Sequence, residues 1–277
     1  MNTIKQIIAV TLLNLRNLPQ RFASSIVAVV GVGAVVLVFA AVLTMAAGLE
    51  KTMMNTGSDD TAVIIRSGST SELNSGLSNE QTLIVANAPG VLKDGDNAII
   101  SAELYVVTDV KKRSTGTDAN VPFRGVQESA FAVRDNVTIS EGRMFEPGKN
   151  EIVVGRAAQE EFVGLDVGDT IRFGQNEWTV VGTFDAGGSV FESELWTDIR
   201  VLQGAYRRGN SFQSVRVRLE SPDSIETLRQ ALDEDPRIDP DVMSEREYYS
   251  SQSQGLVQFI KLIGYPLTIL MAVGASF

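Results

Sequence analysis

Long apolar runs lie at both ends of the chain, and the first one, residues 22–49, contains no charged residue. As a helix, this run would be roughly 42 Å long, more than the ~30 Å hydrocarbon core of a bilayer. A buried helix of a soluble protein would need a polar face, and residues 26–45 show none. A cleaved signal peptide is the alternative, but its apolar stretch is usually about 7–15 residues long. The pattern predicts a transmembrane helix at residues 21–50.

The second apolar run, residues 262–277, is also uncharged and continues to the end of the chain. It is slightly too short to cross a bilayer alone, and Pro266 is tolerated in a transmembrane helix that has neighbours. We therefore expect residues 256–277 to be the start of a second transmembrane helix. The simplest explanation of the ending is that the chain is the front part of a longer membrane protein.

Charges beside the first run predict its orientation. Three basic residues and no acidic residue precede it: Lys5, Arg16 and Arg21. Glu50, Asp59 and Asp60 follow it, with only Lys51 among them. The positive-inside rule places the N-terminus in the cytoplasm and residues 51–255 outside a bacterial inner membrane, in a multi-pass protein. Residues 1–20 have apolar positions at helical spacing, which predicts an amphipathic helix on the inner leaflet; a plain extension of the transmembrane helix is the alternative.

Residues 51–255 show short alternating segments between turn residues, which predicts an α+β domain with a β-rich subdomain. The predicted strands cover residues 61–66, 98–111, 120–126, 151–154, 170–173, 177–184 and 211–219. Ser78 and Gln81 form a capping-box pattern that opens a short helix. Further helices are predicted at residues 155–162 and from Ser221-Pro222-Asp223 through Leu232. Ser244 caps a polar helix, residues 245–258, that we expect to continue into the second transmembrane helix.

Charge and composition narrow the chemistry of this domain. All 34 acidic residues and 20 of the 24 basic residues lie between Glu50 and Gly255, which gives this stretch a net charge of −14 and disfavours binding to nucleic acid. The chain has no cysteine and no histidine, so disulfides, thiolate catalysis and Ser-His-Asp triads are excluded. The acidic clusters at residues 59–60, 160–161 and 233–235 are interpreted as solvated surface charge. We find no candidate catalytic, cofactor-binding or metal-binding residue.

Several stretches resemble the permease subunits of MacB/FtsX-type ABC transporters, including their MacB-like periplasmic core domain. They are LLNLRNLPQR at residues 12–21 with GLE at 48–50, EGRMFEPG at 141–148 followed by EIVVG at 151–155, and LDVGDT at 165–170 with WTVVG at 178–182. Their order and spacing match over nearly the whole chain, which is more specific than any one stretch.

The resemblance implies a noncatalytic permease with four transmembrane helices and a large domain between the first two. It implies a second permease subunit, in a homodimer or heterodimer, and a cytoplasmic ATPase subunit; it also allows a periplasmic adaptor. In this family ATP-driven closure of the ATPases moves the transmembrane helices, and the outer domain transmits the motion to export or extract a substrate. The helix at residues 245–258 would be the natural lever. The third and fourth transmembrane helices would lie beyond Phe277, so the chain alone should not couple to ATP.

Two other classes of protein fit the pattern less well. A sensor or receptor input module also places a domain between two transmembrane helices, and its chain would continue into a long polar helix. A membrane-anchored periplasmic enzyme is disfavoured because no catalytic motif is recognisable. The substrate cannot be read from the sequence.

Overall fold

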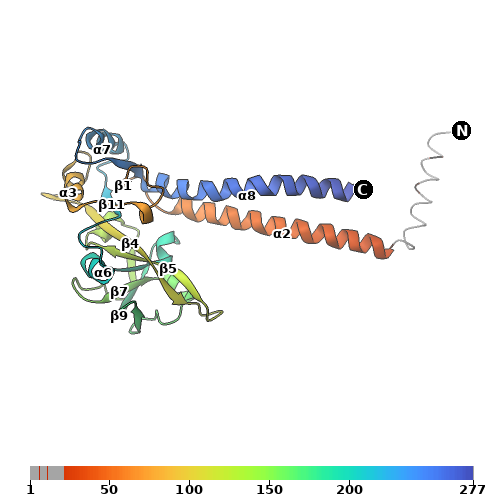
Figure 1. The fold of residues 1–277 in the computed structure, drawn as a ribbon, viewed down its shortest axis with the longest axis horizontal. Coiled ribbons are helices and arrows are strands. Elements are labelled where there is room, and N and C mark those ends of the chain that lie inside the picture. The colour runs from red at the N-terminus through yellow and green to blue at the C-terminus, as the bar shows by residue number, and fades with distance from the viewer. Residues whose placement is uncertain (1–5, 7–10, 12–21, 277) are drawn as a thin grey trace. The chain divides into compact units, whose positions relative to one another are not determined.

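The computed structural model of the chain describes residues 6, 11 and 22–276 (Figure 1). Apart from those two isolated positions, the amphipathic helix predicted at residues 1–20 lies outside the described residues. The chain forms two compact units. Unit 1 contains Met1–Glu50 and Gln254–Phe277, and unit 2 contains Lys51–Ser253.

Unit 1 consists of parts of two long helices, α2 (Phe22–Asn55) and α8 (Glu245–Ser276), which both continue into unit 2. Within α2, Val29–Met53 is the one described segment long and apolar enough to cross a membrane, with a mean hydropathy of 2.6. Only 6% of an 18-residue stretch of this segment is buried, whereas a helix in the core of a soluble protein is mostly buried. The two helices touch where Gly264 faces Phe39: a Cβ on Gly264 would lie 2.6 Å from a ring carbon of Phe39. The glycine therefore permits close packing.

Unit 2 is built on a ten-stranded mixed sheet with the strand order β12-β1-β11-β4-β5-β10-β7-β9-β6, and β8 pairs with β9. The strands are β1 (Thr61–Arg66), β4 (Ile100–Lys111), β5 (Asp118–Val126), β6 (Thr138–Gly142), β7 (Glu151–Gly155), β8 (Thr170–Phe173), β9 (Asn176–Asp185), β10 (Leu195–Asp198), β11 (Ser214–Arg218) and β12 (Pro240–Ser244), with a separate small pair, β2 (Lys93–Asp94) and β3 (Asn97–Ala98). The short helices are η2 (Glu72–Asn74), α3 (Asn79–Asn87), α4 (Ala130–Val133), α5 (Arg156–Glu161), η3 (Val190–Ser193), α6 (Ile199–Ala205) and α7 (Ser224–Asp233). The predicted mixed α and β domain with a β-rich part is confirmed.

Most predicted elements are present within a few residues of their expected bounds. The capping box at the start of α3 forms in both directions between Ser78 and Gln81. The strands β8 and β9 form the predicted hairpin, and α8 begins at Glu245 and runs on without a break, as expected. The strands β2, β6, β10 and β12 were missed. β6 and β12 are the two edges of the main sheet order, where a polar strand or one that begins with proline is tolerated, so their sequences resemble loops. β2 and β10 are only two and four residues long, too short for a clear alternation.

Both faces of the sheet are covered by apolar clusters. Along β1, Ala62 and Ile64 belong to one cluster, whereas Val63 and Ile65 belong to the other, so alternate side chains of a single strand enter both. The first cluster includes residues of α3, α6 and α7. The second contains Trp196 and the aromatic residues of η3 and of the first turn of α8. Burial on both faces explains why four consecutive residues of this strand, 62–65, are apolar.

Candidate functional site

Seven charged side chains are buried together in unit 2, and each is at most 4% exposed. We call them the ion-pair network: Glu72, Glu103, Glu194, Glu245, Arg124, Arg134 and Arg216. They come from η2, β4, β5, β11, the segments beside α4 and β10, and the first residue of α8. Buried charges on this scale are rare, and they persist only when each is paired.

Arg124 and Arg216 connect the carboxylates of the network. The Nε and Nη2 atoms of Arg124 donate to the two carboxylate oxygens of Glu194, at 2.7 and 2.8 Å. Its Nη1 donates to both Glu72 and Glu103, at 2.8 and 2.9 Å. The Nη1 of Arg216 also donates to Glu72 and Glu103, at 2.7 Å each. The two guanidinium groups therefore share two carboxylates, and residues far apart in the sequence become one connected unit.

The first two turns of α8 are attached to this network along one face. Glu245 accepts a hydrogen bond from the Nε of Arg216 at 3.0 Å, and the Tyr249 hydroxyl accepts one from Nη2 of the same arginine at 3.2 Å. The Tyr248 hydroxyl accepts from the backbone N–H of Glu72 at 3.1 Å. One turn later, Gln252 donates to the carbonyl of residue 70 at 2.8 Å. These positions are spaced i, i+3, i+4 and i+7, so they share one side of the helix.

The end of α2 is fixed beside the beginning of α8. The Thr56 hydroxyl accepts a hydrogen bond from the backbone N–H of Val190 at 3.0 Å. A Cβ on Gly57 would lie 2.8 Å from the backbone and side chain of Glu245, and Gly57 has φ = +88°. Glycine is therefore required where the chain leaves α2. Both helices begin or end against the same part of unit 2.

The arginines of the network favour the ionised forms of Glu72 and Glu103. Burial raises the pKa of the Glu103 carboxyl, but the attraction of Arg134, Arg216 and Arg124 outweighs it and lowers that pKa to about 2. Burial likewise opposes ionisation of Glu72, and its arginine neighbours still hold its pKa well below the ordinary value. Burial raises the pKa of Tyr248 to about 12, so its hydroxyl stays protonated. Glu72 and Glu103 therefore stay ionised at neutral pH despite their burial.

Sequence reasoning missed this network. In the sequence of β11, Val215 and Val217 share one face and Arg216 lies on the other, but this alternation gives no sign that the second face is covered. The first turn of α8 was interpreted only as polar. By contrast, the acidic clusters at residues 59–60, 160–161 and 233–235 are exposed or partly exposed, as predicted. Among the described residues, no group of three or more acidic side chains is arranged to hold a metal ion.

The fold and the site define an α+β domain that is continuous with two long helices, α2 and α8. The buried ion-pair network of this domain includes Glu245, the first residue of α8. The sequence profile of the MacB-like periplasmic core domain matches residues 23–235. The chain belongs to this family, which supplies the extracytoplasmic domain of ABC transporter permeases. It is therefore a membrane protein with an extracytoplasmic domain.

Three solved structures are similar to parts of the chain. The extracellular domain of the noncanonic ABC-type transporter YknZ from Gram-positive bacteria is 17% identical, with a TM-score of 0.48; the match covers 66% of this chain and 100% of that domain. The periplasmic region of MacB from Actinobacillus actinomycetemcomitans is 13% identical, with a TM-score of 0.47, and the match covers 73% and 92% of the two chains. A domain of a putative permease from Porphyromonas gingivalis is 12% identical, with a TM-score of 0.42 over 66% and 87%. No curated protein matches the chain.

Proposed function

We propose that the chain is a permease subunit of a MacB/FtsX-type ABC transporter and that it transmits ATP-driven motion between the membrane and its extracytoplasmic domain. Family membership supports the transporter part of this proposal. In the proposal, ATP is hydrolysed by a separate cytoplasmic subunit, the chain itself is noncatalytic, and a second permease subunit completes the transporter. The work done on the outside is export or extraction of a substrate.

The observation that carries the transmission part is the attachment of α8. This helix runs without a break from Glu245 to Ser276. Its first residue belongs to the ion-pair network, and Tyr248, Tyr249 and Gln252 hold the next turns of the same face. A continuous helix transmits displacement and rotation without a hinge. The first two turns of α8 are held by several hydrogen bonds, so they resist sliding against the domain. Motion of α8 would therefore move the domain as one body.

The experiment that tests the transporter assignment is co-purification. The tagged chain, expressed from its native locus together with the neighbouring genes, is extracted from membranes, and ATP hydrolysis and ATP-binding proteins are measured in the eluate. We expect an ATPase subunit to co-purify. If the domain is folded and no ATPase is present under mild extraction, the proposal fails and a receptor input module becomes the better assignment.

A further inference from the structure

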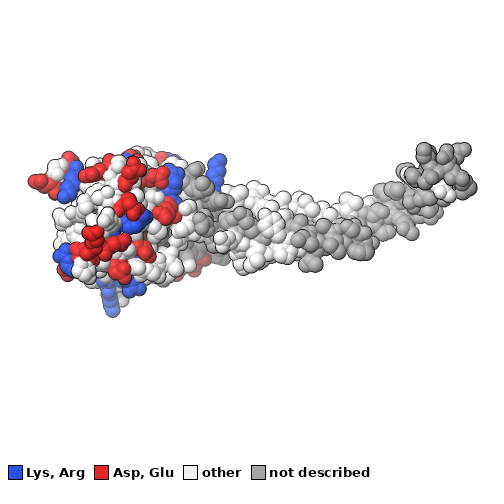
Figure 2. Space-filling model, turned by 90° about the horizontal axis from the view of Figure 1, so that it is seen from above, with Lys and Arg blue, Asp and Glu red and all other residues white. Residues whose placement is uncertain are grey.

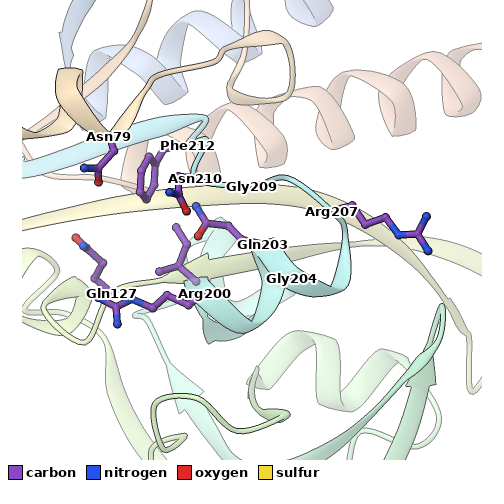
Figure 3. Close-up of a pocket in the computed structure, with 10 residues that line it drawn as sticks. Asn79, Gln127, Arg200, Gln203, Gly204, Arg207, Gly209, Asn210 and Phe212 are labelled. Atoms are coloured by element: carbon purple, nitrogen blue, oxygen red, sulfur yellow. The ribbon is translucent and has the colours of Figure 1, made fainter.

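We propose that unit 2 carries a binding pocket for an acidic peptide segment, separate from the ion-pair network. The pocket has a volume of about 700 Å³ and lies between the start of α3, the residue after β5, α6 and the turn that follows α6 (Figure 3). Its ten lining residues are Asn79, Gln127, Ile199, Arg200, Gln203, Gly204, Arg207, Gly209, Asn210 and Phe212. None of them is acidic, although acidic residues outnumber basic ones by 34 to 24 in the chain and are spread over the face of unit 2 in Figure 2.

Unpaired positive charge is concentrated at and beside this pocket. Of the 20 arginines and lysines of unit 2, 13 form ion pairs with acidic side chains. Three of the seven that do not, Arg200, Arg207 and Arg208, lie within nine consecutive residues, and the first two line the pocket. All three are exposed. A guanidinium group binds a carboxylate through two parallel hydrogen bonds, so this cluster suits a ligand that brings its own acidic group.

Four primary amides line the same pocket and retain free hydrogen-bonding groups. Gln127 uses its carbonyl oxygen to accept from the N–H of Ala102, which leaves its NH₂ group available. Gln203 donates its NH₂ group to the carbonyl of Ser211, which leaves its oxygen available although the residue is only 7% exposed. In the view of Figure 3, Gln203, Asn79 and Asn210 gather near the ring of Phe212. Free amide donors and acceptors match the C=O and N–H groups of a polypeptide backbone.

The turn after α6 is held in a strained shape. Arg207 has φ = +53° and is the only residue other than glycine with a positive φ in the part of the chain that the structure describes. This conformation costs about 1–2 kcal/mol for a side chain that is not glycine. The N–H of Arg208 donates to the carbonyl of Gln203 at 2.9 Å and helps to fix the turn. Figure 3 shows Arg207 extending away from the amide group, so it marks the rim of the pocket.

An acidic peptide fits these observations better than a nucleic acid. The phosphate backbone would be repelled by the net charge of −14 on residues 50–255. A short peptide places a few carboxylates on the local arginines, and its backbone meets the free amides. This proposal does not depend on the transporter assignment, because it concerns binding by unit 2 alone.

The test measures peptide binding by the full chain in nanodiscs through fluorescence anisotropy. The probe is a fluorescein-labelled Gly-Asp-Glu-Glu-Asp-Gly peptide, and the reference is the matched Gly-Asn-Gln-Gln-Asn-Gly peptide. We expect saturable binding of the acidic peptide and at least tenfold weaker binding of the amide peptide. Arg200→Glu should weaken binding at least tenfold, and Asn210→Ala should weaken it about threefold. Both changed residues are exposed, and unchanged tryptophan fluorescence will confirm that the variants are folded.

The matched control is Arg172→Glu. Arg172 is exposed on β8, has no acidic partner and does not line the pocket, and its substitution changes the net charge by the same amount. We expect it to change the affinity less than twofold. The proposal is overturned if neither peptide binds at millimolar concentration, if both peptides bind equally, or if Arg172→Glu weakens binding as much as Arg200→Glu. Tighter binding of polyuridylate than of the acidic peptide would also overturn it.

Discussion

Replacing Arg216 by methionine removes the guanidinium group that joins α8 to the rest of the ion-pair network. Arg216 donates to Glu72, Glu103 and Glu245 and is 0% exposed. After the change, four buried carboxylates face only two guanidinium groups. Glu245 then keeps a single cationic neighbour, Arg134, whose Nε is 3.6 Å away.

The expected loss of stability is large. Removing one partner of a buried ion pair costs about 3–5 kcal/mol, because the remaining charge is left in a medium that solvates it poorly. Arg216 leaves several carboxylates short of a partner, so we expect the upper part of this range. A domain is usually stable by only about 5–15 kcal/mol, and the variant should therefore unfold at a much lower urea concentration.

Tryptophan fluorescence of the full chain in detergent is a suitable assay. The chain has two tryptophans, Trp178 and Trp196, and both are fully buried in unit 2. The matched control is Arg218→Met, two residues further along β11. Arg218 is partly exposed and pairs with Asp135 at the surface, so its loss should cost about 0–1 kcal/mol. If the two variants lose the same stability, the reasoning about the network is refuted.

Three further predictions concern acid, a tight turn and the helix pair. Burial raises the pKa of Glu103, but its arginine partners lower this pKa to about 2. The ionised Glu103 therefore stabilises the folded domain at neutral pH, and this stabilisation is lost as the pH falls from about 4.5 towards 2. The thermal midpoint of unfolding should be flat between pH 7 and 5 and fall below pH 4.5, and a flat profile down to pH 2.5 would contradict this. Gly155→Ala should lower the free energy of unfolding in urea by more than about 2 kcal/mol, because the added Cβ would lie 2.2 Å from a backbone oxygen. Gly76→Ala is the control: it has open space around it and should change this free energy by less than about 0.5 kcal/mol. Equal losses would show that the contact at Gly155 is not rigid. Gly264→Leu should lower the thermal midpoint of unfolding in detergent, because the larger side chain overpacks against Phe39. Adding Phe39→Ala to the same chain should restore part of the thermal midpoint. If the second change restores nothing, the contact with Phe39 is not the cause of the loss.

Much of the fold follows from local patterns in the sequence. The length and composition of α2, the capping box of α3 and the β8–β9 hairpin each depend on residues that are close together in the chain. The strand β12 is different, because a segment that begins with Pro240 and contains Asp241 becomes a strand only by pairing with β1. Such pairing partners are far apart in the sequence, and no local pattern identifies them.

The candidate site depends almost entirely on distant contacts. Glu72 and Arg216 are separated by 144 residues, and Glu103 and Arg216 by 113. Taken singly, these residues look like ordinary surface charges, because charged side chains are rarely fully buried. The resemblance to transporter permeases indicated that the helix at residue 245 matters for motion, but only the structure shows which side chains hold it.

The most direct test of the account measures whether motion is transmitted through the first turns of α8, where the helix joins unit 2. The chain lacks cysteine, so Gln175→Cys in the exposed β8–β9 turn can be spin-labelled at a single position. In the proposed transporter, reconstituted in nanodiscs with two labelled copies of the chain and the co-purified ATPase, the distance between the two labels is then measured by electron paramagnetic resonance before and after trapping with ATP and vanadate. Two glycines inserted after Ser251 interrupt α8, and the same insertion after Thr115, in the exposed β4–β5 turn, is the control. We predict an ATP-dependent change of distance that the control keeps and the α8 insertion abolishes. The same change with the α8 insertion would contradict the account.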